Sequence, residues 1–161
     1  MKKALLVVAL FSGFSFAQQK FACIDPNRIL LESQLVKNKE SQLRAKVEEY
    51  QKQLDQINKR LEDLRKQIES RGIAQNVREQ RIREYQRVEA EGIELQQKAQ
   101  REIAEMREKL EGEIVSRVRT ISEDIAKREG FTGVIDCTVF IYRSAEIDIT
   151  AEVIQRLDQQ K

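Results

Sequence analysis

The sequence of 161 residues has a formal net charge of +2, 35% charged residues, 6% aromatic residues, and neither histidine nor tryptophan. The missing histidine removes the commonest general base and metal ligand, and no glycine-rich phosphate loop or serine-centred nucleophile motif is present. We therefore expect no enzyme, no cofactor and no metal site.

The first 17 residues are typical of a secretory signal peptide. Lys2 and Lys3 form a positive start, residues 4–11 are an apolar stretch, and residues 15–17 place small side chains at the −3 and −1 positions of a cleavage site. The alternative is a transmembrane anchor, but the apolar run is shorter than the ~20 residues that span a bilayer. We expect the mature chain to be exported. Without the two lysines, basic and acidic residues are equal at 27 each, so the mature chain is neutral.

A strand and a short helix are expected next. Residues 20–24 are apolar and compatible with a β-strand, and Asp25 followed by Pro26 is a typical helix start. Residues 32–34 then give a bend before a long helix begins near Leu35.

This first long helix, expected over residues 35–70, organises the fold. Its apolar residues recur in steps of three and four after one step of seven, and this spacing is typical of the seam of a left-handed coiled coil. One helix alone cannot bury so narrow a stripe, so it needs a partner helix. The seam comprises Val36, Leu43, Val47, Tyr50, Leu54, Ile57, Leu61, Leu64 and Ile68.

A hairpin tip is expected between residues 70 and 75, because Arg71 and Gly72 interrupt the helical pattern. A second helix follows and ends at Glu129, where Gly130 is a suitable left-handed cap. It is about 17 residues longer than the first helix at the same rise per residue, so its last part must pack on something other than the hairpin.

Two glycines lie within the second helix. Gly92 and Gly112 each cost a helix interior about 1 kcal/mol relative to alanine. They either permit close packing or form soft points at which the arm bends.

Both chain ends are expected to form a small body. Residues 133–136 and 139–142 are interpreted as two strands joined by a turn, residues 146–149 as a third strand, and residues 151–158 as a final helix capped by Thr150. Such a body has too few apolar residues to be stable alone, so oligomerisation is the natural remedy. The candidate core residues of the body are Phe21, Ile24, Val134, Ile135, Val139 and Ile141.

The fold class is therefore α+β. A signal peptide (1–17) precedes a body formed by residues 18–33 and 112–161, and residues 34–111 form a long antiparallel coiled-coil hairpin, the arm.

Motifs at both chain ends are similar to a known family. The N-terminal motif is Phe21-Ala22-Cys23-Ile24-Asp25, followed by residues 28–33, and the C-terminal motifs are residues 125–131, 134–136 and 147–154. They resemble the Skp/OmpH family of periplasmic chaperones for outer-membrane proteins, over nearly all of the mature chain. The resemblance implies a homotrimer with a β body made by three chains and three arms that enclose a client cavity. The chain departs from the family pattern in being neutral rather than basic and in having two cysteines.

Basic residues gather around the expected tip. Between Asn58 and Arg87, nine basic residues stand against five acidic ones, a net charge of +4. A solvated helix surface with ion pairs between turns explains such a mixture without a function. The functional alternative is contact with an anionic lipid or lipopolysaccharide surface, or with an acidic client. The nine are Lys59, Arg60, Arg65, Lys66, Arg71, Arg78, Arg81, Arg83 and Arg87.

Most seam residues are expected to join the two helices. Four apolar residues fall at irregular positions near the tip or on the second helix, and are candidates for loose contacts with an unfolded client: Ile73, Ile82, Ile93 and Met106.

The two cysteines are placed near the ends of two candidate strands. Export permits oxidation, so Cys23 and Cys137 either form a disulfide or remain two buried free thiols.

The leading hypothesis is an ATP-independent periplasmic holdase that keeps unfolded outer-membrane β-barrel proteins from aggregating. The alternative is a structural or adaptor hairpin of an export or envelope assembly. Adaptors of that kind usually flank the hairpin with larger β domains, which this chain lacks. Nucleic-acid binding is not expected, because the mature chain is exported and neutral.

Overall fold

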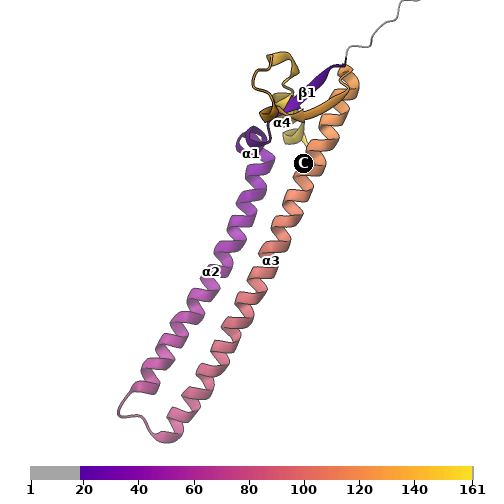
Figure 1. Ribbon diagram of the computed structural model, residues 1–161. Coiled ribbons are helices and arrows are strands. Elements are labelled where there is room, and N and C mark those ends of the chain that lie inside the picture. Colours follow the sequence, from indigo (N-terminus) through magenta and orange to yellow (C-terminus); the bar gives the residue numbers. More distant parts are fainter. Residues whose placement is uncertain (1–18, 161) are drawn as a thin grey trace, which may run out of the picture.

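The computed structural model describes residues 19–160, so the expected signal peptide lies outside the described residues. The chain forms a long helical arm with a small body at one end (Figure 1). In chain order the elements are β1 (Phe21–Ile24), α1 (Pro26–Glu32), α2 (Gln34–Glu69), α3 (Gln75–Glu129), β2 (Gly133–Asp136), the 3₁₀ turns η1 (Cys137–Val139) and η2 (Ala145–Ile147), and α4 (Thr150–Gln159).

The arm consists of α2 and α3, which run antiparallel and side by side to the tip (Figure 1). They contain 36 and 55 residues, or about 54 and 82 Å at 1.5 Å per residue. The extra length of α3 continues into the body, where its last turns pack against both chain ends. Within residues 19–160, no helix is both long and apolar enough to cross a membrane.

The expected seam lies between the two arm helices. Val36, Tyr50 and Leu64 are buried on α2 and face an α3 stripe that includes the buried Val88 and Ala99. Tyr50 brings a hydroxyl into this seam and donates a hydrogen bond to the Glu102 carboxylate. That bond gives the Tyr50 hydroxyl a partner within the seam. It also holds the pKa of Glu102 below its usual range.

The body is built around a two-stranded parallel sheet. β1 pairs with β2 in the register Phe21 to Gly133 and Ile24 to Asp136. On its other edge, β1 meets the chain again, where the Ile149 N–H donates to the Cys23 carbonyl. The core beneath the sheet gathers residues from both chain ends and from α3: Ala22, Ile29, Val36, Ile114, Ile121, Ile125, Ala126, Phe131, Ile149, Val153 and Leu157.

The expected strands over residues 139–142 and 146–149 are wrong. After β2 the Asp136 carboxylate accepts hydrogen bonds from the N–H and hydroxyl of Thr138. This turns the chain into η1 and away from β2, so no hairpin forms. The second stretch contains η2, and only Asp148 bridges to β1.

The C-terminal helix locks the junction between α1 and α2. The Asp158 carboxylate accepts hydrogen bonds from the Ser33 hydroxyl and from the backbone N–H groups of Gln34 and Leu35. Ser33 in turn caps the start of α2 through the Val36 N–H. A residue near the end of the chain thus completes the N-cap of the first arm helix.

Candidate functional site

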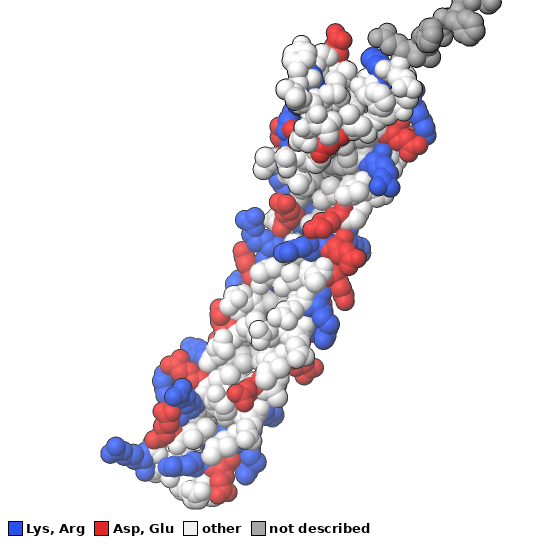
Figure 2. All heavy atoms as spheres, viewed as in Figure 1, with Lys and Arg blue, Asp and Glu red and all other residues white. Residues whose placement is uncertain are grey.

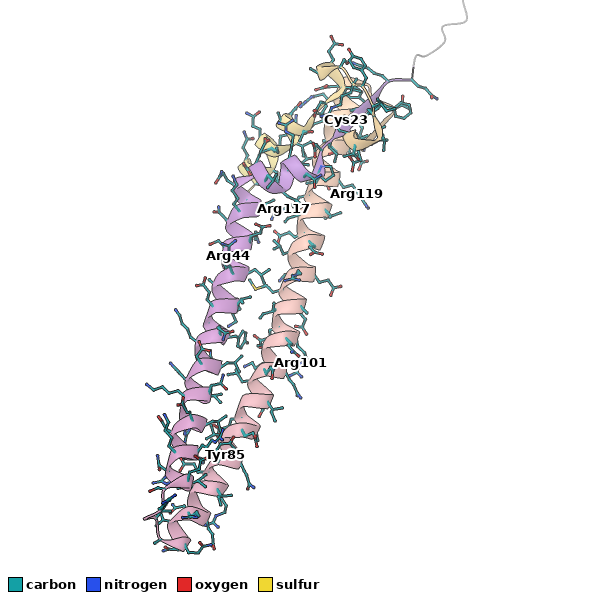
Figure 3. The ribbon with its side chains drawn as sticks, turned by 60° about the vertical axis from the view of Figure 1, so that its left-hand side comes forward. Cys23, Arg44, Tyr85, Arg101, Arg117 and Arg119 are labelled. Carbon is teal, nitrogen blue, oxygen red and sulfur yellow. A yellow bond between two sulfur atoms is a disulfide. The ribbon has the colours of Figure 1, made fainter. Side chains whose placement is uncertain are left out.

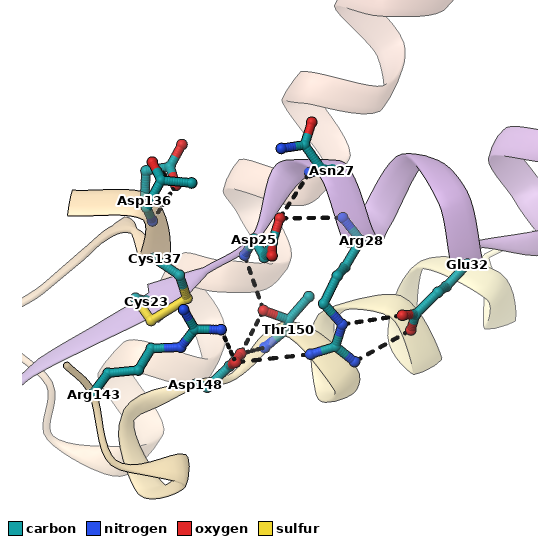
Figure 4. Close-up of polar contacts among 11 residues, drawn as sticks. Cys23, Asp25, Asn27, Arg28, Glu32, Asp136, Cys137, Arg143, Asp148 and Thr150 are labelled. Carbon is teal, nitrogen blue, oxygen red and sulfur yellow. Dashed lines mark hydrogen bonds and ion pairs between the residues drawn. A yellow bond between two sulfur atoms is a disulfide. The ribbon is translucent and has the colours of Figure 1, made fainter. Parts of the chain in front are cut away.

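A disulfide joins Cys23 and Cys137 in the body (Figure 4). Both side chains are fully buried. Cys23 lies in β1 and Cys137 opens η1, so the bond ties the first strand to the turn that follows the second. Of the two possibilities open from the sequence, the structure contains the disulfide.

Asp148 is the centre of the polar contacts beside this disulfide (Figure 4). It accepts hydrogen bonds from the N–H and hydroxyl of Thr150, and it pairs with Arg143 at 3.1 Å and Arg28 at 3.7 Å. Burial disfavours its charge, but the Thr150 and Arg143 hydrogen bonds outweigh burial, so the pKa of Asp148 lies below its usual range.

Asp148 also lies near both cysteine sulfurs, the one grouping of potential metal ligands found within residues 19–160. The sulfurs are bonded to each other and Asp148 is occupied by two guanidinium groups and Thr150. The two sulfurs and the Asp148 carboxylate therefore hold parts of the body together and are not available as ligands for a metal.

The nine basic candidates lie along the tip half of the arm, where Figure 2 shows blue side chains gathered toward its end. Several are already engaged: Arg60 and Arg81 both contact Glu84, and Arg65 and Lys66 pair one turn away with Glu69 and Glu62. Arg87 pairs with Glu91. Within the described chain, three form no ion pair or side-chain hydrogen bond: Lys59, Arg71 and Arg83.

Arg78 has a structural position instead. Its guanidinium donates to the Ser70 carbonyl at 3.1 Å, which satisfies a free carbonyl at the end of α2. Its Nε is buried without a hydrogen-bond partner among residues 19–160. Arg78 therefore braces the tip loop, and of the nine candidates it is the least suited to meet a ligand.

The four apolar candidates differ in exposure. Ile82 and Ile93 are exposed on α3, whereas Ile73 and Met106 are half-buried. The exposed pair lies between the tip and the middle of the arm. Figure 3 shows Tyr85, three residues from Ile82, near the tip, and Arg101 farther up α3.

The six body candidates are mostly outside the core of the single chain. Ile24 and Val134 are half-buried and pack against the core. Phe21, Ile135, Val139 and Ile141 are exposed. The single chain thus leaves a set of large apolar side chains in contact with solvent.

The surface also has two open grooves, which are lined by residues other than the four exposed body candidates. The first, about 720 Å³, lies on the body between α1, the C-terminal part of α3 and the residues that lead into β2. The second lies between the arm helices below the body and shares Leu30, Ile114 and Val115 with the first. The two grooves therefore meet at these three apolar side chains, where the body joins the arm.

The chain matches a family model described as "Outer membrane protein (OmpH-like)" over residues 20–157. The chain belongs to the OmpH-like family. This confirms the resemblance seen in the terminal motifs.

An uncharacterized protein of Aquifex aeolicus (strain VF5) is 34% identical over 159 residues, which cover 99% of this OmpH-like chain and 98% of the relative. Among solved structures, the fold is similar to that of a Caulobacter crescentus CB15 protein described as a candidate outer membrane chaperone (OmpH-like). The TM-score is 0.77, at 18% identity, over 90% of this chain and 87% of the other. The OmpH-like fold, a long helical hairpin on a small body, is thus confirmed.

Sequence reasoning missed the contacts that assemble the body of this OmpH-like chain. Arg28 and Asp148 lie within the terminal motifs, but nothing in those motifs predicted that the two residues meet each other and Arg143. Asp158 is 125 residues from Ser33. The only available signal was the short Asp148-Ile149-Thr150 stretch, where an acidic residue precedes a helix start. The body groove also had no signal, because its lining comes from three separate parts of the chain.

Proposed function

We propose that this OmpH-like chain is an ATP-independent holdase chaperone. Its clients would be unfolded outer-membrane β-barrel proteins, bound in the periplasm and kept from aggregating until they insert. The family membership supports a chaperone role, and the description of the Caulobacter structure agrees with it.

The observation that carries the proposal is the surface of the arm. Apolar side chains such as Val47, Val77, Ile82 and Ile93 remain exposed along a charged hairpin, spread over its length and not gathered in one pocket. Each can make only a weak contact by area. Several weak contacts on a long surface suit an unfolded chain of any sequence, whereas one tight pocket would select a single ligand.

The proposal includes a homotrimer and a periplasmic location. The exposed Phe21, Ile135, Val139 and Ile141 support self-association, because a body of this size with exposed large side chains gains stability by burying them. The signal-peptide pattern of the first 17 residues supports export.

The tip is proposed to contact anionic lipid or lipopolysaccharide. The net charge of the tip supports this role, as do three basic side chains that have no ion-pair or side-chain hydrogen-bond partner within residues 19–160, since their charge is not neutralised locally. Lys59, Arg71 and Arg83 are the residues proposed to make the contact.

One experiment tests the holdase. The purified chain is sized by light scattering and then mixed with a urea-diluted outer-membrane barrel protein while turbidity is followed. We expect a three-chain mass and suppression of aggregation near one trimer per client. A chain that leaves turbidity unchanged would defeat the holdase and favour a structural or adaptor hairpin.

A matched pair of variants tests the arm surface. Ile82→Ser with Ile93→Ser removes exposed apolar area from the arm, so more chaperone should be needed per client. Leu31→Ser removes an exposed apolar side chain from α1, outside the proposed contact, and should behave like the original chain.

A further inference from the structure

Both cysteines of the disulfide are completely buried in the body, with an exposed fraction of 0% each. Cys23 is enclosed by backbone on two sides, because β2 pairs along one edge of β1 and the Ile149 N–H donates to the Cys23 carbonyl at 3.0 Å on the other. A carboxylate oxygen of Asp148 lies within 4.8 Å of both sulfurs, and this carboxylate is held by Arg143 at 3.1 Å. In the closed body formed by residues 19–160, neither Cys23 nor Cys137 is therefore accessible to an external thiol or disulfide.

Thiol–disulfide exchange requires access to a sulfur atom. A thiolate forms a new bond to one sulfur of a disulfide while the old bond breaks and the other sulfur leaves as a thiolate. Burial in the closed body blocks this approach for two reactions: oxidation of the free thiols by an external disulfide, and reduction of the finished bond by an external thiol. The bond must therefore form while the body is still open.

Closure of the body around β1 depends on residues from the far end of the chain. The strand partner of β1 is formed by residues 133–136, and its other edge is bonded by Ile149. Asp25, directly after β1, donates its N–H to the Thr150 hydroxyl at 2.9 Å. Until these residues are in place, β1 has no strand partner within residues 19–160, and Cys23 can react.

We propose that this chain is the substrate of a disulfide oxidant that acts before the body closes. In the first step, the thiolate of one cysteine attacks the disulfide of the oxidant, and a mixed disulfide forms while the second sulfur of the oxidant leaves as a thiolate. In the second step, the thiolate of the other cysteine attacks the chain's sulfur in the mixed disulfide, and the oxidant leaves with both of its sulfurs reduced. Two thiols of the chain are thus oxidised to a disulfide, and one disulfide of the oxidant takes up their two protons and two electrons. This oxidation is independent of the proposed holdase activity.

The register of the sheet favours the second step. Cys23 lies opposite Ile135. Asp136 forms the last pair, with Ile24, and Cys137 follows it directly. Pairing of the two strands therefore brings the second cysteine to the mixed disulfide, and in the finished bond the two Cα atoms are 4.9 Å apart. Because the chain has only two cysteines, a disulfide within one chain can only be this one.

The time at which an oxidant is added tests this order. The chain is unfolded and reduced in urea, freed of reductant and diluted to refold. Oxidised glutathione is added either with the dilution or after the Ile149 N–H, which bonds to Cys23 in the closed body, has become protected from hydrogen exchange. Alkylation in urea then counts the free thiols. We expect the disulfide after early addition and two free thiols after late addition, and oxidation of the closed body as fast as that of the chain in urea would overturn the proposal.

A variant whose body stays open is the matched control for late addition. Val153 and Leu157 are fully buried where α4 packs on the core, so Val153→Asp with Leu157→Asp should hold the body open while both cysteines remain. Late oxidant should form the disulfide in this variant. Leu31→Asp, at an exposed position of α1, should keep its thiols protected like the original chain. Thiols that are equally protected in the open variant would overturn the proposal, because the closed body would not be what shields them.

A second measurement uses the oxidised chain and needs neither refolding nor a variant. Dithiothreitol should reduce the native bond slower than the bond in urea by about a hundredfold or more, because access requires opening of the body. Equal rates would overturn the proposal. A reduced chain in which the Ile149 N–H never becomes protected would show that closure itself requires the bond, which supports the same order. Neither measurement uses a client, so a failed holdase test would leave these outcomes unchanged.

Discussion

The Asp158 carboxylate accepts a 2.6 Å hydrogen bond from the Ser33 hydroxyl across 125 residues of sequence. Two further bonds from Gln34 and Leu35 complete the start of α2. The C-terminal helix therefore stabilises the start of the first arm helix, and removing it should destabilise α2.

Removing this cap should destabilise the chain. Asp158→Ala leaves the first N–H groups of α2 without an acceptor, so the free energy of unfolding should fall by about 1–2 kcal/mol. Urea denaturation at one fixed protein concentration measures it, because self-association makes stability concentration-dependent. Gln159→Ala, one residue along and without a side-chain hydrogen bond to any residue in 19–160, should be neutral; equal losses in both variants would contradict the cap.

Acid should destabilise the body by protonating the carboxylates of Asp158 and Asp148. Burial raises the pKa of Asp158, but the hydrogen bonds from Ser33, Leu35 and Gln34 lower it by more, and the pKa of Asp148 is likewise lowered. A lowered folded-state pKa contributes stability above the unfolded value of about 3.9. That contribution is lost as pH falls through the folded-state pKa.

We therefore expect unfolding free energy to decline below about pH 4. Asp148→Asn with Asp158→Asn should flatten that decline. Asp124→Asn, which removes a carboxylate without hydrogen bonds or ion pairs in the described chain, should leave the pH slope unchanged. A steep slope that persists in the double variant would place the acid sensitivity elsewhere.

The two helix glycines should respond differently to alanine. At Gly112 an added Cβ meets nothing within 4 Å, so Gly112→Ala should stabilise the chain by about 0.5–1 kcal/mol. At Gly92 it would lie 3.1 Å from Cγ2 of Ile57, and this crowding should cancel some or all of the helix gain. Thermal unfolding compares them, and equal stabilisation would show that the helices separate easily at Gly92.

The disulfide should contribute substantially to stability. It spans 114 residues, and the chain-entropy model gives about 4–5 kcal/mol for such a loop. Reductant should lower the unfolding free energy of the original chain and leave the double variant Cys23→Ala with Cys137→Ala unchanged. Two reactive thiols in the denatured, unreduced protein would contradict the bond.

Lipid binding should depend on the three free basic residues at the tip. Lys59→Glu, Arg71→Glu and Arg83→Glu together should reduce binding to anionic vesicles by about a hundredfold or more, because about 1 kcal/mol of surface attraction is lost per charge and about 1.4 kcal/mol is a tenfold change in affinity. The same reversal at Arg44, Lys52 and Arg101, on the arm beyond the tip region, changes net charge equally and should matter less. Equal effects would indicate general charge attraction without a role for the tip.

The sequence predicted the arm well because a coiled-coil seam is a local pattern. The tip near Gly72 and the end of α3 at Gly130, which adopts the left-handed conformation (φ 71°), follow from local breakers. The body was harder. The run Val139–Tyr142 alternates like a strand, but only tertiary structure decides whether a pairing edge is available, and here Asp136 turns the chain away.

The candidate site was predicted less completely than the fold. Nine basic residues were identified by composition, but acidic neighbours decide which of them are engaged in ion pairs. Arg78 instead donates a hydrogen bond to the Ser70 carbonyl at the tip. The groove is assembled from α1, α3 and the start of β2, so no single stretch of sequence could reveal it.

The parallel pairing of β1 with β2 imposes an order on folding. The arm helices are joined by a short tip and can pair soon after synthesis, but β1 must wait for a partner that is synthesised more than a hundred residues later. Contacts of such separation form late and slowly. A nascent chain therefore holds a paired arm, still without the Asp158 cap on α2, while its body is open and β1 with its cysteine stays exposed until β2 has been synthesised.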